Sequence, residues 1–329
     1  MMKKTIIVVL ACLLLLTAAV ACGRTNGETD PQDTPVSPVV EVPDSPVPAA
    51  QVAPATNEPA PSEPAPVEPA PPESNFDTSR VIAVYTREEG SGTRDAFVSL
   101  TGVGEDMYVE AVVESETNQI LTKVEENEYA ISYVSVGSLN AKVKALTFDG
   151  VAPSNETVID GSYKLQRPFL ICVNADNESN ALVQDFISFM ESAEGQDVVA
   201  TKWTKVIPNA PAYTPSGLSG TLKVGGSTSV EPLMGALRQA YIAFNPGVDI
   251  EISGGGSGVG ISEATSGVLN IGMSSRALKD NEKETLTGFD IALDGVAVIV
   301  NPANPVTGMT TDQVKDIFTG EVTRWSDVG

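Results

Sequence analysis

Three loops in the sequence combine glycine with hydroxyl side chains, a combination suited to holding an anion. They are GGSTS at 225–229, GGGSGVG at 254–260 and GSGT at 90–93. Glycine lets backbone N–H groups turn inward, and the N-terminus of a following helix adds unsatisfied donors and a partial positive charge. Together the loops could surround a small tetrahedral oxyanion without a metal, although each one alone is more often only a helix cap.

The sequence lacks the residues that several catalytic and metal sites require. It has no histidine, and of its three cysteines only Cys172 lies beyond residue 22, so a Ser-His-Asp triad, an intramolecular disulfide and a zinc site are not expected. GGGSGVG lacks the spacing of a dinucleotide-binding loop, and no Walker-type Gly-Lys-Ser/Thr is present. We therefore expect a binding protein without cofactor or metal, with a phosphatase as the weakest alternative. The net charge of −23 argues against nucleic acid as a partner.

The N-terminal segment has the pattern of a secretory signal, with Lys3 and Lys4 followed by an apolar run and small residues before Cys22. Its ending, Ala-Val-Ala-Cys-Gly, resembles the lipobox of bacterial lipoproteins. Residues 1–22 are therefore predicted to be a lipoprotein signal peptide with Cys22 acylated, and a plain secretory signal is the alternative. Residues 23–79 are rich in Pro, Ala and Glu and are predicted to form a disordered tether. We expect the protein at the extracellular face of the cell membrane, anchored by lipid.

From residue 80 onward, strand and helix patterns alternate, which is typical of an α/β fold with mostly parallel sheets. The run GVAVIVN at 295–301 is continuously apolar, as a strand covered on both faces would be. Ser229 is the expected N-cap of a helix over 230–244, and Pro232 suits its first turn. Further strands are expected at 80–86, 129–137, 168–174, 221–224 and 248–253, helices at 93–100, at 181–192 and after Thr310, and a loop at 208–220.

Six segments in combination resemble the phosphate-binding lipoproteins of bacterial ABC phosphate importers. The resemblance implies the type II periplasmic-binding-protein fold, in which two α/β lobes are joined by a two-strand hinge and phosphate is held in the cleft. The segments are VGGSTSVEPL (224–233), GGGSGVGI (254–261), IGMSSRALK (271–279), LDGVAVIVNPANPV (293–306), TTDQVKDIFTGEVTRWSDVG (310–329) and REEGSGTRDAF (87–97).

The order of these segments is rotated relative to the family, in which the GGSTS segment comes first. We interpret the chain as a circular permutant, a rearrangement that is tolerated where termini lie close together at the surface. One lobe is then discontinuous, built from 80–167 plus 299–329, and the other is continuous over 168–298 with the hinge crossovers at its ends. The alternative is a fragment of a tandem-domain protein, which would have to exchange halves with a neighbouring chain.

The resemblance implies a set of phosphate ligands. Arg87 is expected to supply the one full positive charge, and a surface salt bridge with Glu88 or Glu89 is its alternative role. The other implied ligands are Thr228, Ser229, Ser257, Ser91, Gly92 and Thr93.

One position departs from the family pattern. Ser275 stands where some members have an aspartate that accepts the proton of phosphate. Because sulfate carries no such proton near neutral pH, an acceptor favours phosphate over sulfate. Asp294 could supply the acceptor instead, or it could only cap a turn with Gly295.

The resemblance implies a function as well as a fold. We expect a monomeric solute-binding protein that captures inorganic phosphate and presents it to an ABC permease, with closure of the lobes as the mechanism. Two alternatives remain open: a binding protein for another oxyanion (sulfate, molybdate or tungstate), and a phosphate sensor or surface protein without a transport role.

Overall fold

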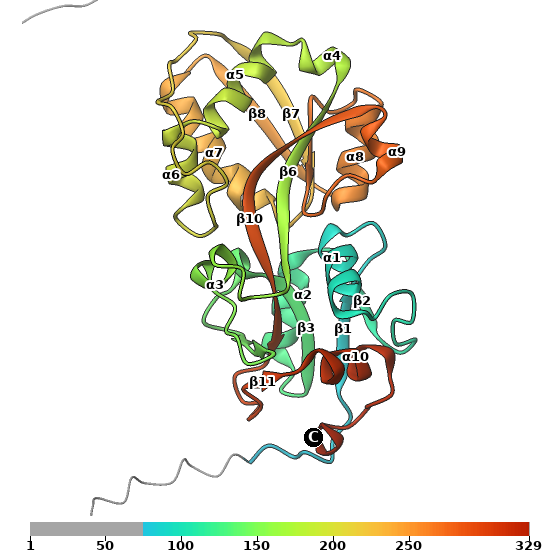
Figure 1. Ribbon diagram of the computed structural model, residues 1–329. Helices are drawn as coiled ribbons and strands as arrows, with labels where there is room; N and C mark the ends of the chain where they lie inside the picture. The colour runs from blue at the N-terminus through green and yellow to red at the C-terminus, as the bar shows by residue number, and fades with distance from the viewer. Residues whose placement is uncertain (1–74, 329) are drawn as a thin grey trace, which may run out of the picture. The chain divides into compact units, whose positions relative to one another are not determined.

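The computed structural model describes residues 75–328. The predicted signal peptide, the predicted lipid attachment at Cys22 and nearly all of the predicted tether lie outside the described residues. Helices and strands alternate along the described chain (Figure 1). The main helices are α1 (Gly92–Thr101), α2 (Thr117–Glu126), α3 (Asn155–Ile159), α4 (Ala175–Glu178), α5 (Ala181–Met190), α6 (Ala193–Val199), α7 (Glu231–Phe244), α8 (Ser257–Thr265), α9 (Asp280–Lys283) and α10 (Thr311–Thr319).

Within residues 75–328, nine strands form one sheet that runs in the order β2-β1-β3-β10-β6-β9-β7-β8, with β4 paired to β10. A second, two-stranded sheet pairs β11 (Gly308–Met309) with β5 (Thr147–Phe148). The strands of the large sheet are β1 (Ala83–Arg87), β2 (Val112–Glu114), β3 (Ala130–Ser135), β4 (Lys144–Ala145), β6 (Gln166–Asn174), β7 (Gly220–Gly226), β8 (Val248–Gly254), β9 (Ile271–Ser274) and β10 (Leu286–Val300).

Two long strands, β6 and β10, cross from one half of the sheet to the other (Figure 1). The first part of β10 pairs with β6, and its last five residues, 296–300, pair with β3. Every pair that involves β6 or β10 is antiparallel, whereas the β1–β2, β1–β3, β7–β8 and β7–β9 pairs are parallel. The expectation of mostly parallel sheets is therefore wrong for the centre of the sheet, because the crossing strands run against their neighbours.

The buried side chains divide into cores that lie on either side of this crossing. One core collects residues between Phe169 and Ala292, and another collects residues up to Leu165 and from Val296 onward. We call the first part the continuous lobe and the second the discontinuous lobe. On β10 the change of core falls between Ala292 and Val296, a few residues before the boundary of 298 expected from sequence. The lobe boundary on β10 is therefore set by which of the two cores each buried side chain of the strand packs into.

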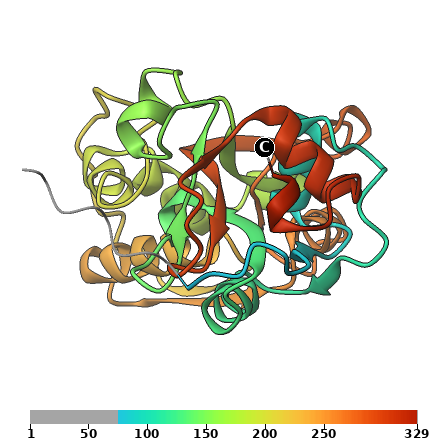
Figure 2. The same cartoon turned by 90° about the horizontal axis from the view of Figure 1, so that it is seen from below.

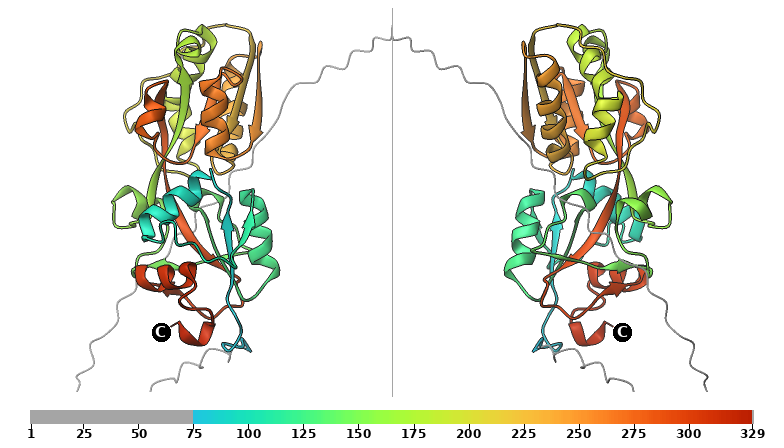
Figure 3. Two further views of the ribbon diagram at one scale, coloured as in Figure 1. Left: turned by 90° about the vertical axis from the view of Figure 1, so that its right-hand side faces the viewer. Right: turned by 90° about the vertical axis from the view of Figure 1, so that its left-hand side faces the viewer.

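In the discontinuous lobe, helices cover both faces of the sheet (Figures 2 and 3). Val296 and Val298 pack into the core shared with α1 and α10, while Ala297 and Ile299 pack against α2. Successive side chains of a strand point to opposite faces, so burial on both faces explains why this run of sequence is continuously apolar.

Two local predictions about chain ends and caps need correction. The cap of α7 is Val230 and not Ser229, whose hydroxyl is engaged elsewhere. The predicted tether ends earlier than residue 79, because the Phe76 ring packs against two other rings. Its centroid lies 5.0 Å from that of Tyr129 and 5.9 Å from that of Trp325. An aromatic ring buries enough apolar surface to attach this segment to the discontinuous lobe.

The start of α10 is as predicted. Thr310 accepts a hydrogen bond from the backbone N–H of Gln313, and the Gln313 side chain accepts one in return from the Thr310 backbone. This reciprocal pair is the capping box that the sequence indicates. Among residues 75–328, no helix combines the length and the apolar character needed to cross a membrane.

Candidate functional site

Four helix N-termini from the two lobes meet where the lobes touch. In the continuous lobe, β7 leads through the 225–229 loop to α7, and β8 leads to α8. In the discontinuous lobe, β1 leads to α1, and β2 leads to α2. The first N–H groups of each helix have no partner within the helix. The geometry thus directs several backbone donors and partial positive charges toward one place.

Hydroxyl groups of opposite lobes contact each other directly at this place. Thr93 Oγ1 lies 2.7 Å from Ser229 Oγ, and Arg87 Nη2 donates a hydrogen bond of 3.1 Å to Thr228 Oγ1. These four side chains are buried. Two of the three sequence-predicted loops therefore contribute to one cluster, and the contacts join residues separated by more than 130 positions in the chain.

The third predicted loop completes the cluster from the continuous lobe. Ser275 Oγ accepts a 2.9 Å hydrogen bond from Ser227 and lies 3.4 Å from Ser257 Oγ, while the Ser275 backbone N–H donates to Ser257 Oγ at 3.1 Å. Gly92 approaches this group so closely that a Cβ there would lie 2.7 Å from Ser275 Oγ and closer still to Ser257 Oγ. Only glycine lets the start of α1 reach the serines.

Arg87 both reaches the hydroxyl cluster and forms an ion pair with Glu88. Its side chain is only 2 % exposed, and it reaches across the lobes to Thr228. Its Nε and Nη2 also donate to the two carboxylate oxygens of Glu88, each at 2.9 Å. The Glu88 carboxylate therefore neutralises the charge of the Arg87 guanidinium, and the guanidinium still contacts the cluster through Thr228.

Sequence reasoning missed Thr117 and Ser227. Thr117 Oγ1 accepts from Arg87 Nη1 at 3.2 Å and lies 3.2 Å and 3.3 Å from the hydroxyls of Thr228 and Ser229. The sequence held a signal for Thr117, because this residue begins an amphipathic helical run. Ser227 stands inside a loop that was recognised, but it was not singled out.

Ser91 has a different position from the other hydroxyls. Its Oγ accepts from the backbone N–H of Arg94 at 3.4 Å and caps α1. The Gly90 carbonyl beside it accepts a 2.9 Å hydrogen bond from Gly258 N–H across the lobes. Ser91 thus orders the start of α1, and the same loop also holds the lobes together.

Asp294 is not brought to the cluster. Its carboxylate accepts from Ser135 Oγ at 2.8 Å and from Arg167 Nε and Nη2 at 3.2 Å and 3.1 Å. The residue lies within β10 and does not cap a turn with Gly295, whose missing side chain makes room for Val136 and Val158. The turn-capping role considered for Asp294 is therefore wrong, and its carboxylate pairs with the buried Arg167 instead of lying in the cluster.

The cluster suits a protonated oxyanion. Each hydroxyl both donates and accepts hydrogen bonds, and a guanidinium donates only. Such a set can give hydrogen bonds to the oxygens of an anion and can also accept the proton that the anion carries. A cavity of about 560 Å³ that includes Thr117 and Thr228 in its lining opens onto the cluster, with Lys202 and Glu231 at its wall.

Two α/β lobes that share two crossing strands and enclose a polar cluster define the class of two-lobed solute-binding proteins. Residues 77–194 and 211–329 match the family model described as a PBP superfamily domain. The match supports the periplasmic-binding-protein-like fold that was expected from sequence.

Similarity to known proteins shows which family within this class the chain belongs to. The chain is 43% identical over 264 residues to "Phosphate-binding protein PstS 2" of Streptococcus pneumoniae serotype 4, covering 78% of this chain and 90% of the relative. "Phosphate-binding protein PstS" of Bacillus subtilis is 34% identical over 114 residues, covering 34% of this chain and 38% of the relative. A crystal structure of a phosphate-binding protein of a phosphate ABC transporter from S. pneumoniae is 42% identical with a TM-score of 0.62, covering 76% of this chain and 100% of that one. The chain belongs to the phosphate-binding protein PstS family.

Proposed function

We propose that this protein binds inorganic phosphate between its two lobes and delivers it to an ABC importer. The observation that carries the proposal is the buried cluster that joins the lobes, above all the contacts from Thr93 to Ser229 and from Arg87 to Thr228. The names of the relatives support the ligand and the transport context. The proposed ligand groups are those of Arg87, Ser91, Gly92, Thr93, Ser257, Ser275, Thr228 and Ser229, with Thr117 and Ser227 added.

The proposed mechanism is closure of the lobes, with no covalent step. Phosphate oxygens would take the place of the contacts between hydroxyls and would bridge donors of both lobes. A ligand that binds one arrangement more tightly shifts the population toward it. The ion pair between Arg276 Nε and Asp95, at 2.9 Å, joins the lobes beside the cluster and would favour the closed arrangement in which phosphate is presented to a permease.

Binding of phosphate rather than sulfate is proposed to depend on hydroxyl acceptors. The Glu88 carboxylate beside the cluster is held by Arg87, and hydroxyls such as those of Thr93 and Ser229 are proposed to accept the phosphate proton. The test is calorimetric titration of the purified protein with phosphate at two pH values, and with sulfate, molybdate and tungstate. One-to-one binding of phosphate, with the other anions at least tenfold weaker, is expected. If another anion binds more tightly than phosphate, that anion and not phosphate is the ligand of this protein.

A phosphate sensor or surface protein would give the same titration result as a transport protein, but it would not act with a permease. Reconstitution with the permease and ATPase subunits from the same genome separates the two. Phosphate uptake that depends on this protein supports the transport role, and full binding without any uptake supports the sensor.

We also propose that Cys22 is acylated after signal cleavage and holds the protein at the extracellular face of the membrane. The Ala-Val-Ala-Cys sequence supports this. Mass spectrometry of the protein from membranes should find the lipid on Cys22. Release of the Cys22→Ala variant into the medium is expected, and retention of that variant on the membrane would contradict the anchor.

The segment order is proposed to be a circular permutation relative to part of the family. The match to the S. pneumoniae relative spans 90% of that relative, whereas the match to the B. subtilis relative spans only 38%. A sequential alignment of two permuted chains can include only one of the two exchanged segments, so a permutation would account for the short match. Light scattering should find a monomer with one phosphate site, and a dimer as the only binding species would favour exchanged halves of a tandem protein.

A further inference from the structure

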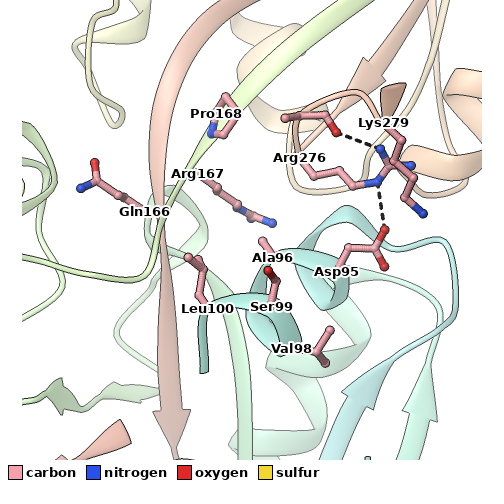
Figure 4. Close-up of a pocket in the computed structure, with 11 residues that line it drawn as sticks. Asp95, Ala96, Val98, Ser99, Leu100, Gln166, Arg167, Pro168, Arg276 and Lys279 are labelled. Carbon is pink, nitrogen blue, oxygen red and sulfur yellow. Dashed lines mark hydrogen bonds and ion pairs between the residues drawn. The ribbon is translucent and has the colours of Figure 1, made fainter. Parts of the chain in front are cut away.

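A second cavity, of about 510 Å³, lies where the lobes and the crossing strands meet (Figure 4). Its walls come from α1 in the discontinuous lobe, from 276–279 in the continuous lobe, and from 166–168 at the start of β6. None of its lining residues belongs to the hydroxyl cluster. The volume is within the range of small-molecule sites.

Arg167 is the feature that points to a ligand in this cavity. Its side chain is 2 % exposed, and Nε and Nη2 donate to Asp294. Its Nη1 has no hydrogen-bond partner among the described residues, and Figure 4 shows the guanidinium extending into the space beside α1. A buried donor without an acceptor destabilises the fold, so a ligand atom that accepts a hydrogen bond from Nη1 would bind here more strongly than it binds to water.

The remaining charges at the cavity favour an anion. Arg276 is already paired with Asp95 and, through two hydrogen bonds of 2.8 Å, with Glu282. Lys279 is exposed at the rim, and within residues 75–328 no carboxylate lies within ion-pair distance of its ammonium. The buried Nη1 and the Lys279 ammonium therefore provide one inner donor and one outer positive charge.

The apolar part of the lining distinguishes an organic anion from an inorganic one. Ala96, Leu100, Pro168 and Ala277 present hydrocarbon to the cavity. A phosphate or sulfate ion needs several donors when it leaves water, whereas among the described lining residues Arg167 Nη1 is the buried donor that has neither a hydrogen bond nor an ion pair. A carboxylate with a short alkyl chain needs fewer, and its chain would cover the apolar wall.

We propose that this cavity binds a small monocarboxylate with a short alkyl chain. The carboxylate lies between Arg167 Nη1 and Lys279, and the alkyl chain lies against Leu100 and Pro168. Because both lobes line the cavity, the bound anion stabilises the closed arrangement and increases the affinity for phosphate. This coupling rests on the proposed function, whereas occupation of the cavity does not.

Butyrate is the probe for the test, with 1-butanol as the uncharged control of similar length. Calorimetry of the intact protein should detect butyrate and no 1-butanol, and saturating butyrate should increase phosphate affinity by about threefold to tenfold at constant ionic strength. Ala277→Leu fills the cavity and Lys279→Gln removes the rim charge. Both should lower butyrate affinity at least about fivefold while leaving phosphate affinity without butyrate unchanged. Lys283→Gln is the matched control, because Lys283 lies in α9, the short helix whose N-cap is Lys279, but does not line the cavity.

The experiment distinguishes failure of the butyrate site from failure of the proposed phosphate-binding function. Absence of butyrate binding, or binding that Ala277→Leu and Lys279→Gln do not weaken, overturns the site. Butyrate binding that leaves phosphate affinity unchanged overturns the coupling. If phosphate itself fails to bind, the proposed function fails, and the butyrate titrations of the three variants still decide whether the cavity is a site.

Discussion

Arg167 and Asp294 are register partners across β6 and β10, and their side chains form a buried ion pair with Nη2 and Oδ2 3.1 Å apart. The pair lies where the chain passes between the two cores. Ser135 Oγ also donates to Asp294, and the Arg167 guanidinium lies over the Phe169 ring at 5.2 Å. Burial lowers the pKa of Arg167, although Asp294 opposes this shift. The pair thus holds the two crossing strands in register at the hinge.

Asp294→Asn should destabilise the protein, because it leaves the Arg167 guanidinium buried without a countercharge. Loss of one partner of a buried pair costs about 3–5 kcal/mol, and urea unfolding measures it. Asp197→Asn, which removes an exposed partner of Lys205, is the control and should cost less than about 1 kcal/mol. If Asp294→Asn leaves stability unchanged and weakens phosphate binding, Asp294 acts as a phosphate ligand.

Gly92→Ala should separate the lobes without unfolding either of them. The added Cβ would meet the hydroxyls of Ser257 and Ser275, while the helical position of residue 92 accepts alanine. Phosphate affinity should fall at least about tenfold, or ~1.4 kcal/mol, as measured by calorimetry. Gly235→Ala in α7 has nothing within 4 Å of its Cβ and should raise stability by about 0.5–1 kcal/mol with unchanged affinity. Equal affinities for the two variants would show that Gly92 does not set the approach of the lobes.

Thr117→Val should weaken phosphate binding by at least about tenfold, because a hydrogen bond to a charged ligand is worth about 1.5–3 kcal/mol. The shape of the side chain is kept, so stability should change little. Thr122→Val in the same helix, whose hydroxyl donates to the Asn118 carbonyl, is the control. A Thr117 variant that binds phosphate as the parent does would mean that this hydroxyl only supports Arg87.

The Arg276–Glu282 pair should make stability depend on pH in the acid range. Hydrogen bonds from Arg276 lower the pKa of Glu282 below its ordinary value of 4.5. The stabilisation is therefore present above the unfolded-state pKa and is lost as the pH falls through the lower, folded-state value. Glu282→Gln should be less stable than the parent at about pH 7, and the difference should shrink at about pH 3. A difference that stays constant, with Glu284→Gln as the control, would contradict the pairing.

Cys172 should be unreactive in the folded protein. Burial raises the pKa of its thiol to about 12, and the thiolate is the reactive form. Labelling by a thiol reagent should follow global unfolding, so its rate should rise with urea. Fast labelling of the native protein would show that the continuous lobe opens locally around β6.

Short-range features of the protein followed from its sequence. The Gly/Ser/Thr loops before helices, the capping box at Thr310 and the apolar run whose residues 295–300 are buried depend on residues a few positions apart, and backbone preferences act at that distance. The resemblance to the family was also carried by such segments. They led to most of the cluster, and Thr117 could have been added by the same reasoning, because it begins an amphipathic run.

Only the tertiary structure decided which of these groups meet. From sequence, Asp294 could have replaced the acceptor that is missing at Ser275, but Asp294 lies opposite Arg167 in the β6–β10 register and its carboxylate pairs with that buried guanidinium. The strand direction at the centre of the sheet, the attachment of Phe76 and the unpaired Nη1 of Arg167 were likewise not readable from local pattern. Pairing and burial join residues more than a hundred positions apart, and their energies depend on desolvation at a common site, which the sequence alone does not place.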